Sequence, residues 1–143
     1  MRVLILMGVV LLAGCPSEPD DSSPAGALHL FLDAMDRSEW DEEAQREAYA
    51  LLSAEARSRL AQRARQAEAL SGRAFEPWDM LTRGRFRLRL APRDRGGMVE
   101  RVQGDRATVV VRGRTPERRA EVPMVRAEDG WRVALEVPPL NRP

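Results

Sequence analysis

Residues 98–112 read MVERVQGDRATVVVR, two β-prone runs on either side of a Gly-Asp pair. Gly-Asp is a common two-residue connection between antiparallel strands. Met98–Gln103 and Arg106–Arg112 are therefore expected to form a hairpin around Gly104-Asp105.

The two-residue alternation extends in both directions from this hairpin. Downstream, a strand is expected at about Arg119–Arg126, and after a turn at 128–130 apolar and polar residues alternate from Trp131 to Val137. Pro138 and Pro139 then end the pattern. Upstream, the apolar residues Phe86, Leu88 and Leu90 alternate with Arg85, Arg87 and Arg89. Each run predicts a strand with one buried face.

The chain before residue 81 has helical periodicity. Ser23 and Pro24 suit the N-cap and first turn of a helix that continues to about Arg37. A second helix is expected to start near Asp41, and a third runs from Ser53 to Gly72. A turn with a short helical piece is expected between Phe75 and Leu81.

Helices followed by strands predict an α+β domain, in which three N-terminal helices pack on one face of a mainly antiparallel sheet. The chain has 143 residues, enough for one domain, which we place at 24–140. No internal repeat is evident.

Four stretches carry a resemblance to a known family. They are a first helix SPAGALHLFLDAMDR, a loop and helix EEAQREAYALLSAEARSRL, the strand GDRATVVV and the closing EDGWRVAL. Over roughly residues 24–137 they resemble the nuclear transport factor 2-like superfamily. The resemblance implies a cone-shaped fold with three helices on a curved sheet and a cavity between them. Members include isomerases, dehydratases, polyketide cyclases and non-catalytic lipoproteins, so the fold does not choose the function.

Residues 1–14 have the pattern of a secretory signal peptide. Arg2 precedes an apolar run from Val3 to Leu12, which is too short to span a membrane. The chain's only cysteine follows directly, and Leu12-Ala13-Gly14-Cys15 resembles the lipobox of bacterial lipoprotein precursors. That resemblance implies cleavage before Cys15 and a diacylglycerol thioether on its sulfur. The alternative is an ordinary signal peptide with an incidental cysteine.

Residues 15–23 are expected to be the lipidated cysteine and a flexible tether, because PSEPDDSS is too polar to bury itself. Pro16 stands where an Asp would retain a Gram-negative lipoprotein at the inner membrane. By resemblance to that sorting rule, we expect the outer membrane, with the domain facing the periplasm.

All 23 basic residues are arginine, and they are unevenly spread. Residues 16–80 hold 7 Arg and 14 acidic residues, whereas 81–143 hold 15 Arg and 8 acidic residues. Arginines on the polar sheet face can bind an anionic envelope partner. The candidates are Arg85, Arg87, Arg89, Arg112 and Arg132. Alternatively, the acidic helices pair internally with the basic sheet. Nucleic acid is not expected as a partner of an exported chain without a clustered basic excess.

Evidence for catalysis in the sequence is sparse. His29, Asp33 and Asp36 lie on one flank of the first expected helix, where His29 held by Asp33 could act as a general base. The alternative is a solvent-facing i,i+4 pair. Tyr49, the only tyrosine, has no acid placed opposite it. Metal-ligand clusters, P-loops, dinucleotide fingerprints and nucleophile elbows are absent from the sequence, so no cofactor is expected.

Three functions are compatible with these residues. The preferred one is a non-catalytic lipoprotein that binds or scaffolds an envelope component. The second is a carrier of a small apolar ligand in a cone cavity lined by Phe31, Met35, Trp78 and Trp131, which serve equally well as ordinary core. The third is an isomerase- or cyclase-like enzyme centred on His29 and Asp33.

Overall fold

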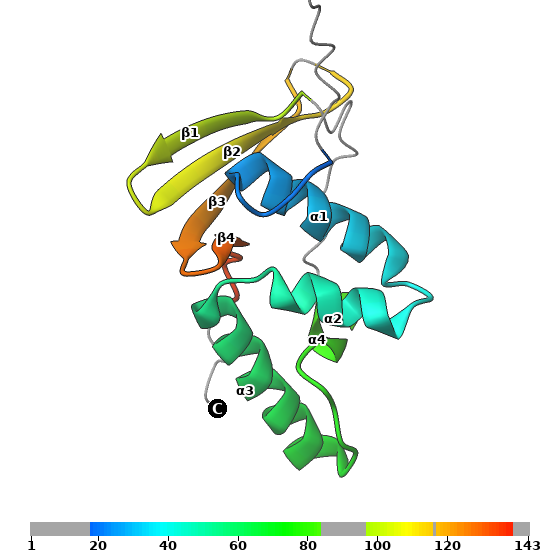
Figure 1. Ribbon diagram of the computed structural model, residues 1–143. Coiled ribbons are helices and arrows are strands. Elements are labelled where there is room, and N and C mark those ends of the chain that lie inside the picture. Colours follow the sequence, from blue (N-terminus) through cyan, green and yellow to red (C-terminus); the bar gives the residue numbers. More distant parts are fainter. Residues whose placement is uncertain (1–17, 84–96, 116, 139–143) are drawn as a thin grey trace, which may run out of the picture.

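A computed structural model describes residues 18–83, 97–115 and 117–138 of the chain. Within these ranges four helices precede a four-stranded antiparallel sheet (Figure 1), which confirms the α+β class. The helices are α1 (Pro24–Arg37), α2 (Glu42–Ala50), α3 (Ala54–Ser71) and α4 (Asp79–Arg83). The strands are β1 (Val99–Gln103), β2 (Arg106–Arg112), β3 (Arg119–Ala127) and β4 (Gly130–Val133).

The helices begin at the residues that the sequence indicates. The side chains of Ser23, Asp41 and Ser53 each accept a hydrogen bond from a backbone N–H of the first turn of α1, α2 and α3. Gly72 ends α3 in the left-handed conformation, with φ of 67°, which glycine adopts at little steric cost. The predicted helix starts and the predicted end of the third helix are confirmed.

The expected hairpin is also confirmed. β1 and β2 pair antiparallel around Gly104-Asp105, with Gln103 opposite Arg106 as the last pair before the turn. Gly104 has φ of 63°, as the tight turn requires. The sheet order is β1-β2-β3-β4, so each strand lies beside its neighbour in sequence.

The last strand is shorter than expected, because β4 ends at Val133 rather than Val137. The backbone N–H of Ala134 donates to the carbonyl of Pro123 at 2.9 Å. Pro123 has no N–H to donate in return, so the ladder ends at this pair. On the other edge of β4, Val133 exchanges backbone hydrogen bonds with Leu51 and Ser53, each at 2.9 Å.

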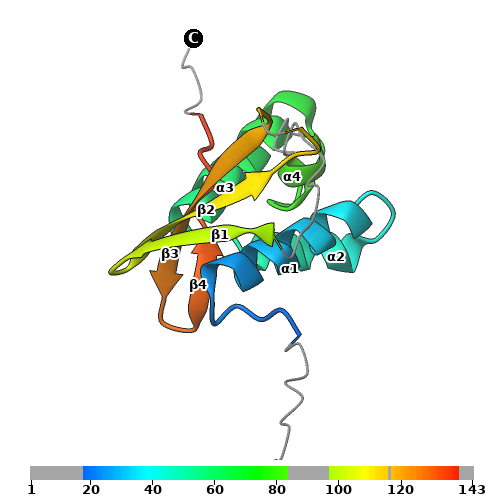
Figure 2. The ribbon, with the colours of Figure 1, turned by 90° about the horizontal axis from the view of Figure 1, so that it is seen from above.

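Most of the core residues come from α1 and the sheet, which lie side by side (Figure 2), and α2, α3 and α4 each add at least one. Leu28, Phe31 and Met35 of α1 belong to the same buried cluster as Val109 of β2 and Met124 of β3. Burial of such side chains contributes roughly 1.5–3 kcal/mol each. The expectation that three helices lie on a curved sheet is wrong in two respects. The sheet is not strongly curled, and α1 is the helix packed against it, while α2 packs on α1 and α3 on α4.

Among the described residues, none of the helices combines the length and the apolar character needed to cross a bilayer. The signal segment and lipobox (Leu12, Ala13, Gly14 and Cys15) and the strand expected at Arg85, Arg87 and Arg89 lie outside the described residues.

Candidate functional site

The sheet has one face toward α1 and one face away from it, which we call the outer face. Val109 and Val111 of β2 are fully buried on the α1 side, so the alternating residues Arg106, Thr108 and Arg112 point to the outer face. The strand register places Arg101 of β1 opposite Thr108, and Arg119 of β3 opposite Arg112, on this same face. The outer face therefore collects arginines from three adjacent strands.

These arginines have few carboxylates near them. Arg101 lies 3.8 Å from Glu121, a partly exposed pair that contributes little to stability. Arg106, Arg112 and Arg119 form no ion pair within the part of the chain that the structure describes, and all three are exposed. Arg112, one of the predicted candidates, is thus available to solvent.

A groove of about 370 Å³ runs across the outer face at the hairpin end of the sheet. The apolar residues of its lining that point to the outer face are Pro123, Val125 and Ala134, and its polar residues include Arg101, Gln103, Arg106 and Thr108. A guanidinium beside an apolar floor suits a ligand that carries both an acidic group and an apolar side chain.

Arg132 does not belong to this exposed set, although the sequence suggested it. Arg132 is 9% exposed, and its guanidinium forms ion pairs with Asp21 at 2.7 Å and with Asp129 at 2.6 Å. The N–H of Trp131 donates to the Asp21 carbonyl at 2.8 Å, and Gly130 leaves room for Asp21, because a Cβ there would lie 2.7 Å from its Cγ. Arg132 therefore binds the segment before α1, at Asp21, to strand β4.

Asp20, one residue earlier, accepts two hydrogen bonds from Ser22. The side-chain hydroxyl and the backbone N–H of Ser22 both donate to Asp20 Oδ1, which lowers the pKa of that carboxyl below its usual value. This is an Asx-type turn that leads into α1.

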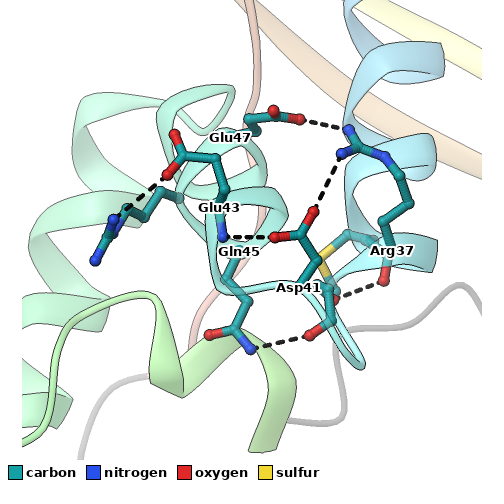
Figure 3. Close-up of polar contacts among 8 residues, drawn as sticks. Arg37, Asp41, Glu43, Gln45 and Glu47 are labelled. Carbon is teal, nitrogen blue, oxygen red and sulfur yellow. Dashed lines mark hydrogen bonds and ion pairs between the residues drawn. The ribbon is translucent and has the colours of Figure 1, made fainter.

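A second polar cluster lies where α1 meets α2 (Figure 3). Arg37 of α1 pairs with Asp41 and with Glu47 across the loop, while Asp41 Oδ1 accepts the N–H of Glu43 at 2.9 Å. The Gln45 side chain donates to the Ser38 carbonyl at 2.9 Å. We call residues 36–47 the Trp40 corner, after the exposed tryptophan in its loop.

Trp40 is 76% exposed, which is unusual for a large aromatic side chain. Its backbone N–H donates to the Arg37 carbonyl at 3.2 Å, and the buried Ser38 hydroxyl donates to Met35 at 2.6 Å. The sequence interpretation did not single out Trp40. The available signal was a tryptophan in a short interhelical loop flanked by acidic residues.

The catalytic candidates form a surface pair. His29 Nε2 lies 3.2 Å from Asp33 Oδ2, one turn apart on α1, with side chains 29% and 44% exposed. Asp36, also a candidate, is exposed near the end of α1. None of the three lines the outer-face groove or the smaller groove of about 240 Å³ between α3 and residues 134–138. The described residues also contain no group of three or more His, Cys, Asp or Glu suited to a metal ion.

Three of the four pocket candidates occupy the interior, and the fourth, Trp78, is partly buried. Phe31, Met35 and Trp131 are 4%, 7% and 3% exposed and belong to the core cluster. Trp78 lies edge-on to Tyr49 at 6.1 Å and beneath the Arg46 guanidinium at 5.2 Å. In the described structure these side chains pack on protein, as the core alternative expects.

Within the described residues, fold and surface together define an α+β domain with an arginine-rich sheet face. In comparisons with known proteins, no family model, no curated protein and no solved structure matched the chain.

Proposed function

We propose that this protein is a lipid-anchored lipoprotein of the cell envelope and that its domain is a non-catalytic binding module for an anionic envelope partner. The observation that carries the proposal is the outer face, where Arg106, Arg112 and Arg119 are exposed without a carboxylate partner in the described structure. An exposed arginine fork binds carboxylate or phosphate in a bidentate manner.

The charge distribution supports an anionic partner. Residues 81–143 hold 15 Arg and 8 acidic residues, and two of those acids, Glu121 and Asp129, are near arginines of the same sheet. The internal-pairing alternative applies to Arg132, which bonds to Asp21. It does not apply to Arg106 or Arg112 within the described residues, and these remain available for a partner.

The lipid anchor is the second part of the proposal, and it rests on the lipobox resemblance at Leu12-Ala13-Gly14-Cys15. Labelling of cells with an alkynyl palmitate should mark the wild-type protein and fail to mark Cys15→Ser. By the same sorting rule, an Asp after the lipidated cysteine retains a lipoprotein at the inner membrane, and this chain has Pro16 there. Wild type should therefore sediment with the outer membrane and Pro16→Asp with the inner membrane. Equal labelling of Cys15→Ser would contradict the anchor.

We further propose that the domain belongs to the nuclear transport factor 2-like superfamily, in a form that works by surface binding. Support comes from the order of helices before an antiparallel sheet. The position of Phe31 and Trp131 within the core favours a surface role over carriage of an apolar ligand.

Partner binding is tested by crosslinking in intact envelopes. Arg106→Glu combined with Arg112→Glu should remove the adducts that wild type forms. The matched control is Arg65→Glu, which reverses an exposed arginine on α3, away from the sheet. Adducts that persist in the double variant would overturn the assignment of the outer face.

A further inference from the structure

The outer-face groove is divided into a polar half and an apolar half. The strands lie in chain order across one layer (Figure 1), and their register sets which outer-face residues are side by side. One row across the groove consists of Gln103, Arg106 and Val125. The next row consists of Arg101, Thr108, Pro123 and Ala134. The groove is therefore polar over β1 and β2 and apolar over β3 and the residue that follows β4.

Arg106 is the available charge of the polar half. It is exposed and has no ion-pair partner in the part of the chain that the structure describes, whereas the Arg101 guanidinium lies 3.8 Å from a Glu121 oxygen. A guanidinium fork binds a carboxylate through two parallel hydrogen bonds. Thr108 and Gln103 line the groove beside it, and their hydroxyl and amide groups can bond to neutral peptide groups. The acidic group of a ligand is therefore expected at Arg106.

The apolar half begins one strand away from this charge. Val125 is the cross-strand partner of Arg106, and Pro123 is the partner of Thr108. The Cβ atoms of such partners are about 5 Å apart. A ligand that fills both halves therefore carries its apolar group close to its acidic group. The C-terminal residue of a peptide meets this condition, because its carboxylate and its side chain branch from the same Cα.

Other acidic ligands match the groove less well. On an extended peptide, neighbouring side chains point to opposite sides, so an internal Asp or Glu has its nearest apolar neighbour on the same side about 7 Å away. The phosphate of a lipid headgroup is separated from the acyl chains by the glycerol, and an acidic sugar carries no branched apolar side chain. Each of the last two leaves the apolar half uncovered, whereas an apolar chain end covers both halves.

We infer that the outer-face groove binds the C-terminal end of a peptide or protein whose last residue is apolar. The carboxylate bonds to Arg106, and the last side chain lies on Val125 and Pro123. The groove volume of about 370 Å³ is at the small end for ligand sites, so it takes the end of a chain rather than a long segment. The inference rests on the proposed function, since it names the ligand of the same arginine face.

The test is an NMR titration of the isotope-labelled full-length protein in a neutral detergent. The probe is the peptide acetyl-Gly-Ala-Val with a free carboxylate, and the comparison is the same peptide with a C-terminal amide. The free acid should shift the backbone amide signals of β2 and β3 at the groove, with a Kd of about 1 mM. The amidated peptide should bind at least tenfold more weakly, because it lacks the charge that Arg106 binds. Equal binding of the two peptides, or no shift up to about 10 mM free acid, would overturn the inference.

Two substitutions test the two halves of the groove separately. Arg106→Gln should weaken binding of the free acid at least tenfold. The matched control is Arg65→Gln, which removes an exposed charge on α3 and should bind like wild type. Wild type should also bind a peptide that ends in valine several-fold more tightly than one that ends in glycine. Val125→Thr keeps the side-chain shape but adds a hydroxyl, so it should lose most of this preference; unchanged binding by Arg106→Gln would contradict the assignment.

A third peptide distinguishes a chain end from an acidic side chain. It has an internal aspartate and an amidated C-terminus, and it should bind at least tenfold more weakly than the free acid. If it bound as tightly, the groove would bind acidic side chains, and the assignment to chain ends would be wrong. The proposed function has its own test: it would still stand if no peptide bound but Arg106→Glu with Arg112→Glu lost the envelope crosslinks.

Discussion

Leu60 is the large apolar side chain that α3 contributes to the core. It is 0% exposed and is the only large apolar side chain buried on this 18-residue helix, where the other buried residues are Ala56 and Ala64. Replacement with alanine loses the transfer free energy of the removed atoms and leaves a cavity. The neighbouring alanines are too small to fill it, so Leu60→Ala should cost about 3 kcal/mol of unfolding free energy.

A matched control lies on the same helix. Leu70 is 82% exposed, so Leu70→Ala makes the same chemical change without a cavity and should shift stability by about 0.5 kcal/mol or less. Urea titration followed by far-ultraviolet circular dichroism gives both values. If Leu60→Ala cost as little as Leu70→Ala, α3 would not be held by core packing, and its polar contacts to residues 137 and 138 would have to hold it.

Three further substitutions test local features of the fold. Gly130→Ala should cost about 2 kcal/mol in urea titration, because φ is 146° and the new Cβ would displace Asp21; wild-type stability would refute the contact. Ser22→Ala should raise the Asp20 pKa toward 3.8 in an NMR titration, because it removes the hydroxyl that donates to the carboxylate. The stabilisation that this bond gives is present above pH 3.8 and is lost as the pH falls through the lowered pKa. An unchanged pKa would mean that the Ser22 hydroxyl does not stabilise the carboxylate. Pro123→Val should supply the missing N–H and extend β4, and rapid hydrogen exchange at the new amide would contradict this.

Local patterns predicted most of the elements. Helix starts follow from short side chains that cap the first turn, as at Ser23 and Ser53, and the cap and the helix are neighbours in sequence. The same holds for the Gly104-Asp105 turn, whose conformation depends on two residues. Such features need no knowledge of the tertiary structure.

Features that depend on distant residues were not predictable in this way. The end of β4 is set by Pro123, a residue of the neighbouring strand whose missing donor matters only once the register is known. Arg132 has the alternation of a polar sheet face, but Asp21, 111 residues earlier, binds it. The sequence pattern predicted an arginine face, and the register was needed to show that Arg101, Arg106, Arg112 and Arg119 share it.

The attachment of Asp21 to β4 has a mechanical consequence. A pull on the chain ahead of residue 18 first loads the bonds of Asp21 to Trp131 and Arg132, before any strain reaches the first turn of α1. Because β4 lies beside β3 and is also bonded to residues 51 and 53, the load spreads into the sheet and the α2–α3 connection. The sheet therefore resists tension applied at the N-terminal side, and helix α1 is protected from unwinding from its first turn.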